Sequence, residues 1–208
     1  AGMTAQAKTY ELVRERFPTV AIELERCESS AELVHARSGE PSLRLLAGGL
    51  YVHSRYDPRE EGRKAASEAL AGGAQLLVMA GLGLGYAAQA ALMEGASLVA
   101  VEPDLGVLKA AIAATDMSWL FEHPRCSLVT VEELPSFLEN SEARAVALLE
   151  NPAIASAYPN ACKLIRAAYD RSRQKDRINA ATLKRFGRRW VRNLSANTHI
   201  FSSSDGIE

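Results

Sequence analysis

Hydrophobic and polar positions follow two different periods along the chain, and the change between them falls near Asp57. Before that residue, short apolar runs are separated by the turn-forming tripeptides SGE and AGG, which predicts a small antiparallel β unit. After it, continuous apolar runs alternate with segments of helical periodicity. This alternation predicts a parallel sheet whose strands are joined by right-handed crossovers.

The expected elements follow from these periods. An apolar stripe predicts a helix over 4–17 that ends at Pro18, and strand-like runs cover 31–37, 41–46 and 49–54. A helix is expected over 58–71, because its start has an N-cap residue, a first-turn proline and a capping-box acid in the right order: Asp57, Pro58 and Glu60. Gly72 and Gly73 are expected to end this helix in a left-handed conformation. The remaining elements are predicted as strand 76–80, helix 85–94, strand 98–102, helix 104–115, strand 126–131, helix 133–140 and strand 145–149.

The C-terminal quarter is basic and helical. From Tyr158 onward, eleven Lys and Arg residues stand against four Asp and Glu, so this part carries +7 and the rest carries −8. Two helical pieces are expected over 158–200, with an apolar stripe formed by Leu183, Phe186, Trp190, Val191 and Leu194. That stripe needs a partner, which indicates a fragment of a longer protein, and Ala1 and Gly2 resemble a cloning remnant. The predicted domain organisation is an N-terminal helix and β unit over 3–56, an α/β domain over 57–157, a basic arm over 158–200 and a tail over 201–208.

Composition indicates a globular protein with an ordinary core. Hydrophobic residues make up 48% of the 208 positions, and no apolar run reaches the roughly 18 residues that a membrane-spanning helix needs. The three cysteines, Cys27, Cys126 and Cys162, have no C-x-x-C spacing. We therefore expect free thiols and a cytoplasmic location, with no membrane association.

The run LLVMAGLGLGYAAQAAL carries the candidate binding site. Gly81, Gly83 and Gly85 follow a buried strand and open a helix, where backbone N–H groups can approach a ligand at the positive end of the helix. Glu102 ends the next strand, about where a carboxylate can accept hydrogen bonds from ribose hydroxyls. Tyr86 is expected either to stack on a base or to pack over the turn. These five residues form the predicted cofactor-binding set.

The ligand of this set stays open between two classes. The spacing of Gly83, Gly85 and Ala88 fits the dinucleotide fingerprint, whereas three alternating glycines followed by an acid are similar to the S-adenosylmethionine turn of methyltransferases. In those enzymes an acid precedes the turn, and here that position is Met79. Asn151-Pro152 is a weak, partial match to the N-P-P-aromatic motif of amino-methylating enzymes. The fold is accordingly predicted as α/β and Rossmann-like, or methyltransferase-like.

No catalytic or metal-binding constellation is expected. The four histidines lack metal-ligand spacing, and adjacent His53 and Ser54 on a strand would point to opposite faces, so they cannot form a charge relay. Asp57 is better explained as a helix cap. The basic arm has few aromatic residues, which makes nucleic-acid binding an unfavoured function.

Four stretches, in this order, carry a resemblance to a known family: HSRYDPREEGRKA, LLVMAGLGLGYAAQAAL, LVAVEPDLGVLKAAI and FGRRWVRNLSAN. From about Leu50 to Asn197 the chain resembles the N-terminal region of the motility accessory factors, glycosyltransferases whose better-known members add nonulosonic sugars to bacterial flagellin. The resemblance implies that a central domain similar to 6-hydroxymethylpterin diphosphokinase follows and carries the transfer chemistry.

Two functions are weighed on this basis. The first is a Rossmann-like accessory domain of a flagellin-modifying glycosyltransferase, not catalytic in isolation. Its expected partners are the downstream glycosyltransferase-like domain, flagellin and a second copy of the chain bound through the C-terminal helix. The alternative is an S-adenosylmethionine-dependent methyltransferase or an aminopropyltransferase-like enzyme. A nucleotide sugar and S-adenosylmethionine are the candidate ligands.

Overall fold

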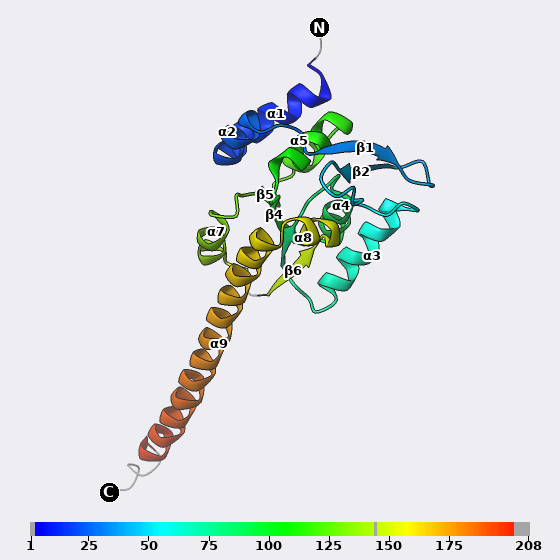
Figure 1. Ribbon diagram of the computed structural model, residues 1–208. Helices are drawn as coiled ribbons and strands as arrows, with labels where there is room; N and C mark the ends of the chain where they lie inside the picture. The colour runs from blue at the N-terminus through cyan, green and yellow to red at the C-terminus, as the bar shows by residue number, and fades with distance from the viewer. Residues whose placement is uncertain (1–2, 144, 202–208) are drawn as a thin grey trace, which may run out of the picture. The chain divides into compact units, whose positions relative to one another are not determined.

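The computed structural model describes residues 3–143 and 145–201, which divide into one compact unit up to Tyr169 and a second from Asp170 onward. At the centre of the first unit lies a parallel sheet of four strands in the order β5-β4-β3-β6. Figure 1 labels β4, β5 and β6 of this sheet. Its strands are β3 (Leu76–Ala80), β4 (Ser97–Val101), β5 (Cys126–Leu128) and β6 (Val146–Glu150). The predicted α/β, Rossmann-like class and the central place of 76–80 are confirmed.

Strand β3 is buried at all five positions because it has a parallel neighbour on each side. Leu77 and Val78 are fully buried, and the strand contains no polar side chain. Such continuous apolarity is what a strand covered on both faces requires. The chain runs from β3 outward through β4 to β5 and then returns to place β6 on the other side of β3, so the strand order reverses between β3 and β6.

Helices connect the strands within the first unit. They are α3 (Pro58–Leu70), α4 (Tyr86–Met93), α5 (Leu105–Ala114), α6 (Ser118–Glu122), α7 (Leu134–Asn140) and α8 (Pro152–Ala157). Asp57 caps α3 by accepting a hydrogen bond from the Glu60 N–H over 3.0 Å, with Pro58 in the first turn, as predicted. Helix α3 packs on α4 so closely that a Cβ on Gly62 would lie 2.6 Å from Tyr86 Cβ. A glycine at position 62 is therefore needed for this crossing.

A small β unit precedes the parallel sheet. Strands β1 (Ala31–His35) and β2 (Pro41–Leu45) pair antiparallel and lie beside α5 (Figure 1). The third strand expected over 49–54 is wrong, because Tyr51 makes only an isolated bridge with Arg44. The segment after this bridge instead turns inward, and Val52 and His53 are buried.

Proline explains a further difference near the N-terminus. The predicted helix ends at Arg16 as α1 (Ala5–Arg16), but Pro18 begins a second helix, α2 (Pro18–Arg26), because proline fits the first helical turn as well as it ends a helix. Helix α2 buries Val20 and Leu24.

One helix, α9 (Pro159–Phe201), replaces the two pieces expected in the C-terminal quarter. Its first part belongs to the first unit, where Cys162, Ile165 and Ala168 join the core. The predicted stripe from Leu183 to Leu194 and the tail lie outside the part of the chain whose side chains the structure describes. No helix among the described residues is long and apolar enough to cross a membrane.

Candidate functional site

The turn between β3 and α4 is built from three glycines in a left-handed conformation. Gly81, Gly83 and Gly85 have φ angles of +88°, +55° and +80°. Residues with a Cβ rarely adopt these angles, so the alternation of glycines in the sequence is the cause of the turn. Gly85 is the N-cap of α4 and has no side chain with which to cap it. The backbone N–H groups of the turn must therefore find other partners.

Glu102 supplies the partner for two of them. It follows β4 directly, is 4% exposed, and its Oε2 accepts hydrogen bonds from the Leu82 N–H at 2.9 Å and the Gly83 N–H at 3.3 Å. Burial raises the pKa of the Glu102 carboxyl to about 7, against the opposing effect of these two hydrogen bonds. Its Oε1 is buried and makes no hydrogen bond with any described residue. Glu102 thus contacts the turn through the turn's own backbone, and a bond from Glu102 to ribose hydroxyls stays a prediction.

His53 supplies the third partner. Its Nε2 accepts a hydrogen bond from the Leu84 N–H over 2.8 Å, so this nitrogen carries no proton. Burial lowers the pKa of His53 to about 4, which keeps the ring neutral at pH 7. Sequence reasoning considered His53 only as a catalytic group and missed this role. The signal was present in the stretch HSRYDPREEGRKA, whose first residue is His53.

Each glycine of the turn faces a different part of the protein. A Cβ at Gly81 would contact Ile154 and Asn151, one at Gly83 would overlap the His53 ring, and one at Gly85 would approach Trp119 and Leu120. A bulky residue at Gly83 would clash with the His53 ring, because Gly83 packs directly against it. The turn is enclosed by its own chain on these three sides.

Asn151 closes the side toward β6. Its Oδ1 accepts hydrogen bonds from the Ala153 and Ile154 N–H groups and so caps α8, while its Nδ2 donates to the Val52 carbonyl over 2.7 Å. All polar atoms of this side chain are thereby used within the protein. The asparagine of the Asn151-Pro152 pair is a helix cap that also holds the segment carrying His53.

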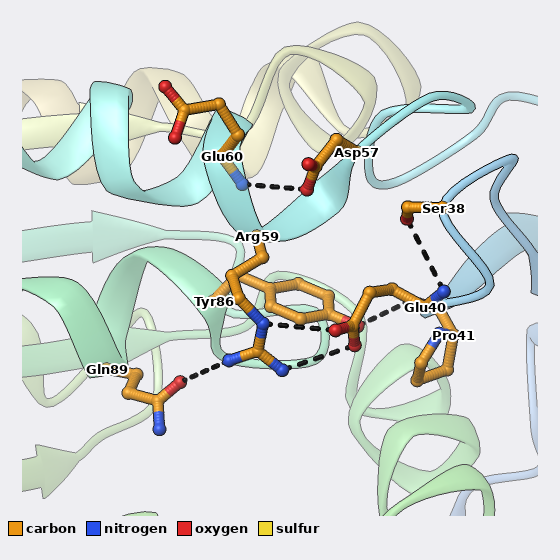
Figure 2. A network of polar contacts seen from close by, with 8 residues as sticks. All are labelled: Ser38, Glu40, Pro41, Asp57, Arg59, Glu60, Tyr86 and Gln89. Atoms are coloured by element: carbon orange, nitrogen blue, oxygen red, sulfur yellow. Dashed lines mark hydrogen bonds and ion pairs between the residues drawn. The ribbon is translucent and has the colours of Figure 1, made fainter.

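Tyr86 lies at the start of α4 and links three segments, as Figure 2 shows. Its hydroxyl donates to the Pro41 carbonyl over 2.7 Å, and its ring meets His53 edge to face at 5.1 Å. The Arg59 guanidinium lies 5.7 Å from the ring centroid and forms a two-pronged ion pair with Glu40. The Tyr86 side chain thus contacts His53 and Pro41, and stacking on a base stays a prediction.

A cavity of about 280 Å³ opens on the other side of Glu102, beyond the ends of β4 and β5. Its lining includes Glu23, Glu102, Pro103 and Thr130, but none of the three glycines. The structure therefore joins Glu102 to the turn and also to a cavity, while the glycines lie outside that cavity. Among the described residues, no cluster of His, Cys, Asp and Glu is arranged to hold a metal ion. The site is a turn whose Leu82, Gly83 and Leu84 N–H groups are bonded to Glu102 and His53.

One curated relative and two solved structures are among the known proteins to which this chain is similar. No protein-family profile matches the chain. A curated relative from Treponema pallidum (strain Nichols), described as an uncharacterized protein, is 28% identical over 209 residues, covering 92% of this chain and 70% of that protein.

The Maf glycosyltransferase from Magnetospirillum magneticum AMB-1 superposes with a TM-score of 0.53 at 16% sequence identity. The alignment covers 79% of this chain and 34% of the glycosyltransferase, so the chain spans about a third of that protein's length. This likeness shows a shared fold. MNMC2 from Aquifex aeolicus is 16% identical over 68% of this chain and 54% of its own, but its TM-score of 0.32 is too low to support an argument.

Proposed function

We propose that this chain is the Rossmann-like accessory domain of a motility-associated, flagellin-modifying glycosyltransferase, and that it does not transfer sugar by itself. The observation that supports the non-catalytic role is that the backbone N–H groups of the glycine turn already have hydrogen-bond partners inside the protein. The N–H groups of Leu82, Gly83 and Leu84 are all bonded to Glu102 or His53. Groups already paired inside the protein are not available to hold a phosphate or a ribose.

The link to a glycosyltransferase rests on two supports. The first is the order of the four stretches that resemble the motility accessory factors. The second is the fold shared with the Maf glycosyltransferase over 79% of this chain. In this proposal the transfer chemistry belongs to a further domain, and this domain orients its partners, which are that domain and flagellin. A cytoplasmic location belongs to the same proposal and agrees with the three free cysteines.

The test compares the isolated chain with the full-length gene product. Each is incubated with recombinant flagellin and a nucleotide-activated nonulosonic sugar, and the flagellin mass is measured. We expect the full-length protein to add sugar, the isolated chain to add none, and a full-length variant lacking residues 3–169 to lose most of its activity. Transfer by the isolated chain, or a gene product without a further domain, contradicts the proposal.

One observation favours the alternative, an S-adenosylmethionine-dependent methyltransferase or aminopropyltransferase-like enzyme. The buried Oε1 of Glu102 has no partner among the described residues, and the carboxyl lines a cavity. Binding of S-adenosylmethionine at the turn would require Glu102 or His53 to release the backbone N–H groups. Calorimetry with 1 mM S-adenosylmethionine decides between the two functions: we expect no heat of binding, and saturable binding that Glu102→Gln weakens at least tenfold would establish the alternative.

A further inference from the structure

A second pocket lies on the small β unit, away from the glycine turn. It encloses about 360 Å³ and is lined by His35, Arg37, Tyr51, Arg55 and Tyr56 together with two apolar residues. Backbone hydrogen bonds build it, because the Arg37 N–H donates to the Arg55 carbonyl and the Ser38 N–H donates to the Tyr56 carbonyl, each over 2.9 Å. These bonds bring the end of β1 against the segment that precedes α3. We call it the Arg37–Arg55 pocket.

Each arginine of the pocket is held by an aromatic ring. The Arg37 guanidinium lies 4.9 Å from the centroid of the Tyr56 ring, and the Arg55 guanidinium lies 4.9 Å from that of Tyr51. A ring face orients a guanidinium without removing its charge or occupying its in-plane N–H donors. Both side chains are therefore positioned and still able to bind an anion.

Neither guanidinium is neutralised. Throughout residues 3–143 and 145–201, no described ion pair involves Arg37 or Arg55. The nearby acids of the β unit are already engaged, since Glu32 pairs with Arg44 and Glu40 pairs with Arg59. Two positive charges thus meet in one pocket without a carboxylate between them, an arrangement that a bound anion would stabilise.

The chemistry of the pocket favours phosphate. Two guanidinium forks from different segments match the charge and the three oxygens of a phosphate dianion better than those of a single carboxylate. A volume of about 360 Å³ lies in the range of small-molecule sites. The part of the chain before Tyr158 carries a net charge of −8, which repels a long polyanion such as nucleic acid. A compact phosphorylated molecule avoids most of that repulsion.

We propose that the Arg37–Arg55 pocket binds the phosphate or diphosphate group of a small phosphorylated molecule, with Arg37 and Arg55 as the anion-binding residues. This site is separate from the glycine turn and goes beyond the proposed function, because it requires neither sugar transfer nor a further domain. Free phosphate, a sugar phosphate and a nucleotide share this chemistry, and the test separates them.

The test is isothermal titration calorimetry of the 208-residue chain at constant ionic strength. The probes are inorganic phosphate, pyrophosphate, glucose 6-phosphate and cytidine monophosphate. The phosphate-free controls are acetate, which carries a carboxylate, and cytidine, which is the uncharged nucleoside. We expect at least one phosphate-bearing probe to bind with submillimolar Kd, and the double variant Arg37→Gln with Arg55→Gln to weaken that binding at least tenfold. The double variant Arg37→Lys with Arg55→Lys keeps both positive charges but lacks the planar guanidinium groups that can donate two parallel hydrogen bonds. It should retain part of the affinity for phosphate.

The matched control is Arg44→Gln, which removes an arginine of the same β unit that lies outside the pocket and is paired with Glu32. It should bind the probes as the wild type does. Circular dichroism checks that each variant keeps the fold, which is expected because the pocket is built by backbone bonds. Equal loss in the control, equal binding of acetate, no binding of any phosphate probe, or tighter binding of a ten-nucleotide DNA strand than of pyrophosphate would each overturn the proposal.

Discussion

The imidazole of His53 and the backbone of Leu84 are joined by a hydrogen bond of 2.8 Å in which Nε2 accepts. The two residues are 31 positions apart and come from the segment after the small β unit and from the glycine turn. A Cβ on the neighbouring Gly83 would overlap the same ring. This contact fixes the turn against the β unit, and it explains why position 83 has no side chain.

Gly83→Ala should destabilise the protein by about 3 kcal/mol, because it adds a clash with His53 to the strain of a positive φ. Gly48→Ala is the matched control: its φ is +78°, but a Cβ there meets nothing within 4 Å. The control should cost about 1 kcal/mol, from strain alone. Urea unfolding measures both. Equal losses would show that the His53 ring does not fill the space over Gly83.

Acid should weaken the fold through His53. Its pKa is 6.5 as a free group and about 4 when folded, so the stabilisation is complete above pH 6.5 and is lost as the pH falls to about 4. The loss amounts to about 3 kcal/mol over that window. The difference in unfolding free energy between wild type and His53→Gln, measured from pH 7 to pH 4, should shrink by this amount. A constant difference would mean that the folded protein protonates His53 freely.

Glu102 should make the protein less stable as the pH rises, the opposite of the effect of His53. Burial raises its pKa from 4.5 to about 7, so the protonated, folded form is favoured at low pH and stability is lost as the pH rises from 4.5 to 7. Relative to Glu102→Gln, which stays neutral, the wild type should lose about 3 kcal/mol over this range and nothing further above it. Unfolding measured between pH 4.5 and pH 8 checks this. Comparing the wild type with Glu102→Gln isolates the effect of Glu102, because both proteins contain His53 and share its pH dependence.

Tyr86→Phe should cost about 1–2 kcal/mol, since it leaves the Pro41 carbonyl without the hydroxyl that now donates to it over 2.7 Å. Arg59→Met breaks the neighbouring ion pair with Glu40, whose arginine side chain is 58% exposed, and should cost less than about 1 kcal/mol. Both losses are measured by urea unfolding. If Arg59→Met costs more than Tyr86→Phe, the network in Figure 2 is held by charge instead of by the buried hydroxyl.

The C-terminal helix should mediate association. Leu183, Phe186, Trp190 and Leu194 recur at helical spacing, and burial of such a stripe at about 25 cal/mol per Å² contributes several kcal/mol, enough for dimerisation or for docking on a further domain. Light scattering should find a dimer for the wild type and a monomer for the double variant Trp190→Glu with Leu194→Glu. A monomeric wild type at high concentration contradicts this prediction.

Local sequence determined the elements whose causes are local. The continuous apolarity of 76–80 predicted a strand buried on both faces, and Asp57 with Pro58 predicted the start of α3. The alternating glycines predicted a left-handed turn. These features depend on residues within one or two turns of chain, so reading the chain in order was sufficient. Pro18 shows the limit, because a proline can end one helix and begin another, and the sequence does not distinguish the two.

Only the tertiary structure decided what the glycine turn binds. The sequence placed Glu102 near the turn but could not show that its carboxylate pairs with Leu82 and Gly83, or that His53 reaches Leu84. A free backbone N–H and one satisfied by a distant side chain look identical in sequence. The difference arises because the small β unit packs against α5 and the segment that follows it carries His53 to the turn. That packing depends on contacts between segments far apart in the chain.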